Sequence, residues 1–204
     1  MKILPDEFYH LPTLELANSL IGKLLVHDTD EGRLSGYIVE TEAYMGVLDQ
    51  AAHSFGGRKT KRTEVMFSEP GHIYTYQMHT HTLINVVAED VGEPHAILIR
   101  ALEPLEGQAT MARNRNQLPM KQWTNGPGKL TKALGITMQH YGSLWSEPPL
   151  YIAEGRIPQS VSTGPRIGID NSGEAVHYPY RFWETDNPYV SKYRTPKQPP
   201  SDTR

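Results

Sequence analysis

Two glutamates stand on either side of one threonine in the stretch VETEAYMG, residues 39–46. Because side chains alternate along a β-strand, we expect Glu40, Glu42 and Tyr44 on one face. Burying a charge without a partner costs several kcal/mol, so a solvated face is the ordinary interpretation. A carboxylate at the wall of a cleft is the other, and it would have the fixed position that a general base needs. Alternation alone does not separate the two glutamates.

A basic segment follows in AAHSFGGRKTKRTEVMF, residues 51–67, a short way beyond His53. Four cations occur there after a Gly-Gly pair, without an acid between them: Arg58, Lys59, Lys61 and Arg62. A solvated loop explains this composition. Alternatively, the glycines allow a close backbone approach and the cations form a local phosphate-binding patch.

Tyrosines and histidines gather in GHIYTYQMHTHTLIN, residues 71–85. Tyr74 and Tyr76 are expected on one strand face, where they can simply cover the core. A metal site is the alternative. Its ligands would be His79 and His81, which are two residues apart, with His53 or His72 as a third. No His-Glu-x-x-His spacing supports that alternative.

The segment NGPGKL, residues 125–130, places Gly126 and Gly128 ahead of Lys129 at an expected helix start. Free amides at a helix N-terminus attract anions, and a lysine adds a point charge. The Walker spacing is absent, so a plain turn and cap is an equally good interpretation.

The elements that must position these residues are a mixture of helices and strands, so we predict an α+β fold in one domain. Thr13 is the expected N-cap of the first helix and Gly22 its stop. After this first helix the pattern predicts two strands within 23–44, and the second of them covers 33–44. A hairpin within 72–89 and a strand over 95–102 follow. The pattern then predicts a helix over 103–116, a helix within 126–135, and short strands at 165–169 and 180–184.

Composition limits the function classes. The chain has 204 residues, of which 38% are hydrophobic and 21% charged, and no run approaches the roughly 20 apolar residues of a membrane span. The first residues lack the apolar core of a secretory signal, so we expect an intracellular protein. Without cysteine, disulfides, thiolate metal sites and cysteine nucleophiles are excluded. With a net charge of −3, any binding to nucleic acid must use a local patch.

Taken together, five stretches resemble the 3-methyladenine (alkyladenine, methylpurine) DNA glycosylases in their order and spacing: VETEAYMG, AAHSFGGRKTKR, MFSEPGHIYTY, LIRALEPLEG and NGPGKL. The resemblance covers residues 10–192, and ETEAY together with RALEPLEG carries most of its specificity. It implies one glycosylase domain over residues 1–192, with a curved, mainly antiparallel sheet, surrounding helices and a protruding β-hairpin. Residues 193–204 are expected to form a flexible Pro-rich tail.

The resemblance implies a monofunctional enzyme of base-excision repair. Such an enzyme flips an alkylated or deaminated purine out of duplex DNA and hydrolyses its N-glycosidic bond, leaving an abasic site. The expected lesions are 3-methyladenine, 7-methylguanine, hypoxanthine and ethenoadenine. No cofactor or metal is implied, and the expected partner is damaged double-stranded DNA, approached from the minor groove by a monomer. The expected location is the cytoplasm, with the nucleoid if the source is bacterial.

Residue roles carried over by the resemblance begin with Glu42 as the general base that deprotonates a water molecule, as in inverting glycoside hydrolysis. Arg100 corresponds to the arginine that helps to hold this water and the flipped nucleotide. The base pocket is expected to contain Tyr44, His53, Tyr76 and Asn85. Aromatic faces there can stack on a base and favour a cationic one. Glu40 is expected to be a structural acid paired with a cation.

Contacts to the DNA backbone are expected from the basic segment and from the helix start: Arg58, Lys59, Lys61, Arg62 and Lys129. The chain departs from the family at the hairpin, which typically carries an aromatic wedge. Here the segment QMHTHTLI is one residue shorter and leaves Met78 or His79 to fill the gap of the flipped base. Two alternatives remain: a metal-dependent hydrolase using His79, His81 and a glutamate, and a non-catalytic module that binds lesion DNA.

Overall fold

Eight β-strands form one sheet in the computed structural model, which describes residues 1–191. Within that range the strands are β1 (Leu24–Thr29), β2 (Gly32–Tyr44), β3 (Ile73–Met78), β4 (His81–Ala88), β5 (His95–Glu106), β6 (Leu150–Ala153), β7 (Val161–Gly164) and β8 (Arg181–Glu184). Neighbours follow the order β3-β4-β5-β2-β1-β6, with β8 on β2 and β7 on β8. All the paired strands of this described part are antiparallel, which confirms the predicted α+β fold with a mainly antiparallel sheet.

Three α-helices pack around this sheet in the same part of the chain: α1 (Thr13–Ser19), α2 (Gln108–Asn114) and α3 (Pro127–Leu134). Short 3₁₀ helices connect the elements, namely Asp6–His10, Gly46–Leu48, Phe55–Gly57, Glu64–Phe67, Met120–Gln122, Met138–His140 and Gly173–His177. Leu16 and Ala17 of α1 are buried, as their helical spacing predicts. Helix α3 ends at Gly135, whose φ of 68° is the left-handed conformation that favours glycine at a helix end.

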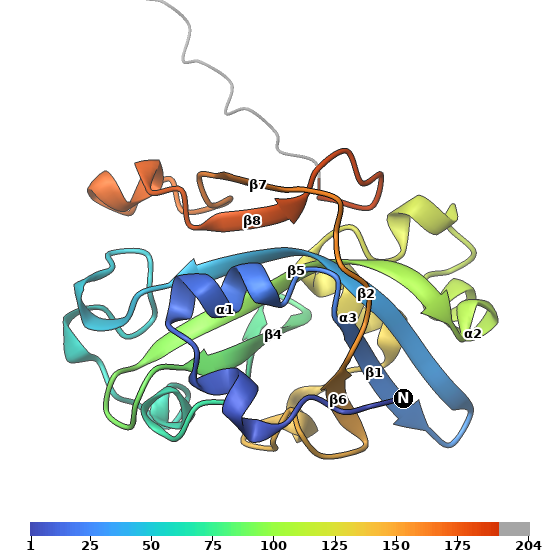
Figure 1. Cartoon of the computed structure of the whole chain (residues 1–204), viewed down its shortest axis with the longest axis horizontal. Coiled ribbons are helices and arrows are strands. Elements are labelled where there is room, and N and C mark those ends of the chain that lie inside the picture. Colours follow the sequence, from blue (N-terminus) through green and yellow to red (C-terminus); the bar gives the residue numbers. More distant parts are fainter. Residues whose placement is uncertain (192–204) are drawn as a thin grey trace, which may run out of the picture.

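Strand β2 changes its partner halfway along its length. Residues 32–37 pair with β1, whereas residues 40–42 pair with β8, and β5 pairs along the opposite edge. Register shifts on both sides of Glu40 mark a β-bulge, which bends and twists a strand. Figure 1 shows the β7–β8 pair (orange to red) lying over the long strands β2 and β5. The glutamates of β2 therefore lie between two strands that each carry an arginine, Arg100 on β5 and Arg181 on β8.

The β3–β4 hairpin is present where it was predicted, with His79 and Thr80 at its turn. Its second strand packs against α3, because the Thr131 hydroxyl donates to the Thr82 carbonyl at 2.6 Å. Gly128 allows this close approach, since a Cβ there would lie 2.7 Å from that of His81. The NGPGKL segment thus supports the hairpin.

Three local predictions were wrong. Pro12, not Thr13, is the N-cap of α1, and Thr13 instead donates its backbone N–H and its hydroxyl to Glu89. Residues 103–106, predicted as helix, continue β5 because the long β2 strand supplies pairing partners. Residues 165–169, predicted as a strand, form bends, since Ile167 N–H donates to a carboxylate rather than to a strand.

Residues 193–204, predicted as a flexible tail, and the predicted domain boundary at 192 lie outside the described residues. Among the helices of residues 1–191, none combines the length and the apolar character needed to cross a bilayer.

Candidate active site

A cavity of about 340 Å³ opens beside the C-terminal half of β2. Its walls come from β2, the loop after β2, the β3–β4 hairpin, β5 and the bends at 167–169. The side chains that line it are mostly apolar or aromatic, with a few polar groups, which is typical of a small-molecule site. Those of the predicted site residues that line it are Tyr44, His53, Tyr76, Met78, Asn85 and Arg100.

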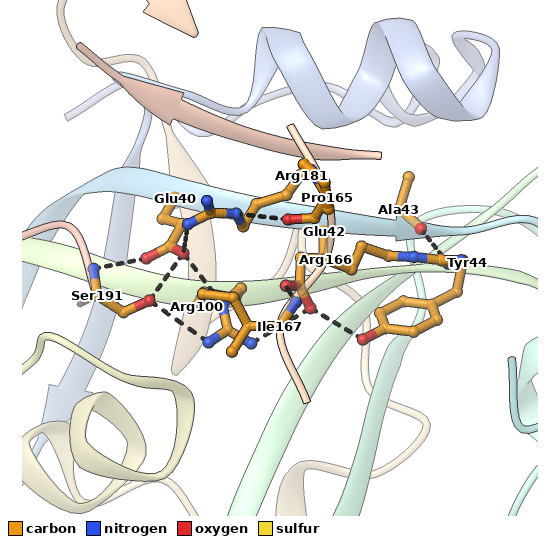
Figure 2. A network of polar contacts seen from close by, with 10 residues as sticks. All are labelled: Glu40, Glu42, Ala43, Tyr44, Arg100, Pro165, Arg166, Ile167, Arg181 and Ser191. Atoms are coloured by element: carbon orange, nitrogen blue, oxygen red, sulfur yellow. Dashed lines mark hydrogen bonds and ion pairs between the residues drawn. The ribbon is translucent and has the colours of Figure 1, made fainter. Parts of the chain in front are cut away.

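Glu42 is buried directly behind this wall, and its carboxylate accepts three hydrogen bonds (Figure 2). Oε2 accepts from the Tyr44 hydroxyl at 2.9 Å and from Arg100 Nη1 at 3.2 Å. Oε1 accepts from the backbone N–H of Ile167 at 2.7 Å. All three donor residues line the cavity. A carboxylate has about four acceptor sites, so the site for one more donor remains. The solvated-face interpretation of β2 is wrong.

Arg100 joins the two glutamates of β2 (Figure 2). Its Nε donates to Glu40 Oε1 at 3.1 Å while its Nη1 donates to Glu42. Burial lowers the pKa of the Arg100 guanidinium, but the carboxylates of Glu42 and Glu40 outweigh burial, and the net shift is upward. Arg100 therefore remains a cation at the cavity wall.

Glu40 is fully buried and does not line the cavity. Besides Arg100, it accepts from Arg181 Nη1 at 3.2 Å and from Ser191, through the backbone N–H at 2.7 Å and the hydroxyl at 2.8 Å. Arg181 also donates from Nε to the Pro165 carbonyl at 2.9 Å, which connects Glu40 to the bends at the cavity wall. The expectation that Glu40 pairs with a cation is confirmed.

Tyr44 forms one wall of the cavity and donates to Glu42. Burial raises the pKa of the Tyr44 hydroxyl well above its usual value, and the charge of Glu42 raises it further. The hydroxyl therefore stays protonated and acts as a hydrogen-bond donor to the carboxylate.

His53 and Tyr76 form a second aromatic wall. Their ring centroids are 4.6 Å apart at an interplanar angle of 85°, and Tyr74 packs against Tyr76 at 5.5 Å. Burial, together with the positive charges of the neighbouring Arg62 and Arg58, lowers the pKa of His53 from 6.5 to about 4. At neutral pH this imidazole is uncharged.

The hydrogen bonds of His53 select one tautomer. Arg62 can only donate, so its Nη2, 3.3 Å from His53 Nε2, identifies that nitrogen as the acceptor. Nδ1 then carries the proton and donates to the Tyr74 hydroxyl at 2.9 Å. Both ring nitrogens of His53 thus have a partner, which fixes the orientation of the ring at the cavity wall.

Asn85 lies on β4 and lines the cavity. Its Nδ2 donates to the Tyr74 carbonyl at 3.0 Å, which identifies the nitrogen end of the amide. The other end is a carbonyl oxygen, so the side chain can present an acceptor to a ligand.

Sequence reasoning missed a buried ion pair that connects two cavity loops. Arg166 Nη2 donates to Asp49 Oδ1 at 2.8 Å, and the guanidinium carbon lies 4.7 Å from the centre of the Tyr44 ring. Asp49 also accepts from the backbone N–H of Met45 and of Ala51. This pair holds the segment that presents Ile167 N–H to Glu42. Arg166 lies within PRIGI, where a strand was predicted, so no local pattern pointed to it.

The predicted DNA-contacting residues are on the surface. Met78 is 47% exposed at the end of β3 and lines the cavity, and His79 adopts a φ of 54° in the turn. The four cations of the basic segment are exposed, and Lys59 lies 4.9 Å from the centre of the Phe67 ring. Lys129 donates to Asn125 Oδ1 at 2.8 Å. Across residues 1–191, His79 and His81 included, no three potential ligands come together to hold a metal ion.

Comparisons with known proteins give a consistent result. The profile of a family described as methylpurine-DNA glycosylase matches residues 7–188. A protein of Bacillus velezensis is 65% identical over 191 residues, which cover 94% of this chain and 97% of that protein. A protein of Bacillus subtilis is 64% identical over 189 residues, covering 93% and 96%. One from Listeria monocytogenes is 50% identical over 194 residues, covering 94% of each. All three carry a provisional name as a 3-methyladenine DNA glycosylase.

Proposed function

Because the chain belongs to the methylpurine-DNA glycosylase family, we propose that Glu42 activates the water molecule that hydrolyses the bond between a damaged purine and its deoxyribose. The family makes this protein a DNA glycosylase that binds DNA and serves DNA repair. The lesions, the flipping step and the role of each residue belong to the proposal.

The observation that carries the proposal is the position of the Glu42 carboxylate. It is buried next to the cavity and held by three donors that all line the cavity wall. Its remaining acceptor site can take a water molecule, and a carboxylate at this position can receive a proton from that water. The water then attacks the anomeric carbon on the face opposite the departing base.

Charge development supports this assignment. The sugar acquires oxocarbenium character as the base departs, and the negative Glu42 stabilises that positive charge. Arg100 holds the carboxylate in place and, as a cavity-lining cation, helps to orient the water and the flipped nucleotide. One carboxylate suffices where the lesion already supplies a good leaving group.

In the proposed complex the flipped purine occupies the cavity. It stacks between Tyr44 and the wall made by His53 and Tyr76, and the Asn85 amide screens its edge. Cavity size does not by itself separate the lesions, so we include 3-methyladenine, 7-methylguanine, hypoxanthine and ethenoadenine. Discrimination among them depends on groups at the purine edges.

We assign Met78 as the residue that fills the gap left in the duplex. It is half exposed at the hairpin, it reaches the cavity, and methionine is an accepted apolar wedge in the minor groove. His79 flanks it in the turn. The protein has a net charge of −3, so attraction to DNA requires local cations, for which we propose Arg58, Lys59, Lys61, Arg62 and Lys129.

We propose that the enzyme acts on damaged DNA as a monomer. We place the enzyme in the cytoplasm, with the nucleoid in a bacterial cell, since its substrate is genomic DNA. No lysine or terminal amine takes part in the proposed chemistry, so the product is an abasic site in an uncut strand.

A base-release assay tests the proposal. Duplex oligonucleotides that each carry one of the four lesions are incubated with the protein, and released base and strand breaks are measured separately. We expect base release, with strand breaks appearing only after alkali. Breaks without alkali would show a lyase, and loss of activity in a chelator would support a metal-dependent hydrolase. Binding without release over hours would indicate a non-catalytic lesion-binding module.

A further inference from the structure

Arg62 contacts the second aromatic wall of the cavity from outside. Its guanidinium carbon lies 4.9 Å from the centre of the Tyr76 ring, and its Nη2 is 3.3 Å from His53 Nε2. Tyr76 and His53 line the cavity, whereas Arg62 does not. The cation therefore acts on the cavity through these two rings. Such a position differs from that of a cation that only projects into solvent to meet a phosphate.

Other arginines beside the cavity are neutralised by carboxylates. Arg100 pairs with Glu40 and Glu42, and Arg166, which lies over the Tyr44 ring, pairs with Asp49. Arg62, by contrast, has no carboxylate within ion-pair distance among residues 1–191.

Each aromatic wall thus has an arginine against it, and the two arginines differ in whether a carboxylate balances their positive charge. The cation against Tyr44 is compensated by Asp49, and the cation against Tyr76 is not.

We propose that Arg62 sets the charge preference of the cavity, so that it disfavours cationic alkylated purines and favours neutral purine lesions. The inference rests on the proposed function, and it concerns which class of damaged base that site processes fastest. It adds a specificity role to the phosphate contact proposed above for the basic segment.

The physical basis is competition for the Tyr76 ring. A cation is attracted to an aromatic face by the ring quadrupole, and Arg62 already uses Tyr76 in this way. A second cation in the cavity is repelled by the guanidinium across the ring, although solvent screens part of this repulsion because Arg62 is exposed. Purines alkylated at N3 or N7 carry a positive charge in the nucleotide, whereas hypoxanthine and ethenoadenine are neutral.

The difference between the two kinds of lesion persists in the transition state. As the bond breaks, a neutral purine gains negative charge, which a nearby cation stabilises, whereas a cationic purine only approaches neutrality. Since the charge on either base falls by the same amount, the guanidinium discriminates by the charge that each base carries on entering the cavity. His53 does not compensate, because burial and the two arginines of the loop keep it uncharged at neutral pH.

The test compares two lesions in one sequence context, 7-methylguanine as the cationic base and hypoxanthine as the neutral one. For wild-type protein and each variant, kcat/KM for base release is measured on both, and the ratio of the two values is the readout. Arg62→Gln removes the charge but can still donate to His53. Arg62→Lys keeps the charge. Lys61→Gln is the matched control, because it removes a neighbouring charge whose side chain contacts neither ring.

We expect Arg62→Gln to raise the ratio of cationic to neutral release by about threefold or more, the size expected for one charge acting across a ring in a partly solvated site. Arg62→Lys should restore the wild-type ratio. Lys61→Gln should lower both rates by the same factor and leave the ratio unchanged. A second readout is the pKa of His53, followed by NMR, which should rise in Arg62→Gln.

An Arg62→Gln variant that slows both lesions equally would show a phosphate contact alone and overturn the inference. A ratio that falls would overturn it as well. Failure of the proposed function looks different, since the wild-type protein would then release neither base and no ratio would exist.

Discussion

Replacing Glu40 by alanine should destabilise the fold by about 3–5 kcal/mol, the cost of leaving buried charges without their partner. Glu40 is fully buried and accepts from Arg100 at 3.1 Å, from Arg181 at 3.2 Å and from Ser191 at 2.7 and 2.8 Å. Both arginines are at least nine-tenths buried at their side chains. Without Glu40, Arg181 has no acidic partner among the described residues, and Arg100 retains only Glu42.

A glutamine at the same position keeps the shape but loses the charge. Its amide oxygen can still accept, whereas its NH₂ group faces donors and leaves at least one of them unsatisfied. An unsatisfied buried polar group costs about 1–3 kcal/mol, so Glu40→Gln should lie between wild type and Glu40→Ala. Urea unfolding followed by tryptophan fluorescence gives the three free energies of unfolding, and unchanged m-values would show that the same surface unfolds.

Arg181→Met provides the control for this reasoning. In the double variant Glu40→Ala, Arg181→Met, one of the unpaired charges is gone, so the destabilisation should be smaller than the sum of the two single effects. A free energy of unfolding for Glu40→Ala within about 0.5 kcal/mol of the wild-type value would be no larger an effect than that of an ordinary surface substitution. It would show that the buried network does not stabilise the fold.

Three further predictions concern the cavity. Arg166→Met should lower kcat for base release by about tenfold, because without the ion pair to Asp49 the segment no longer holds the Ile167 N–H on Glu42; unchanged single-turnover rates would refute this. The free energy of unfolding should decline as pH falls from 6.5 towards about 4, because His53 takes up a proton in the unfolded chain but stays neutral in the fold. Urea unfolding at several pH values should show a smaller decline for His53→Gln than for wild type, and equal slopes would count against this role of His53. Met78→Gly should slow base release from duplex DNA more than from single strands, because a wedge matters only where a base must be kept out of the stack; equal slowing would remove Met78 from that role.

Elements with strong local signals were predictable from the sequence. Strand-like runs on either side of turn residues located β2 and the hairpin, and Gly135 located the end of α3 because few other residues adopt its left-handed conformation. Helix α2 was placed too early, since pairing with β2 extended β5 through residues that favour a turn or helix on their own. Tertiary pairing thus overrode the local preference.

The position of Glu42 was predictable only through the family resemblance. Its partners come from distant parts of the chain, Arg100 on β5 and Ile167 in the bends, and no pattern within β2 indicates them. From alternation alone, Glu40 and Glu42 were equivalent and a solvated face was the ordinary interpretation. Burial of both depends on the change of partner from β1 to β8, which brings Arg181 beside Glu40.

The Arg166–Asp49 pair was not predictable from the residues. The two residues are 117 positions apart, and each lies in an irregular segment without a periodic pattern. A buried ion pair of this kind becomes visible only when the loops are placed in space. It explains how a segment without regular structure can present a backbone donor to a carboxylate.

The most direct test of the central claim is the Glu42→Gln variant, measured for binding to lesion DNA and for single-turnover base release on the same duplex. Glutamine can still accept from Ile167 N–H but cannot take a proton from water. We predict binding close to that of wild type and a release rate reduced on the order of a hundredfold to ten-thousandfold. Glu103→Gln, which removes an acid paired with Arg156 away from the cavity, is the control and should release base at the wild-type rate. Release by Glu42→Gln within a few-fold of wild type would contradict the assignment of Glu42 as the base.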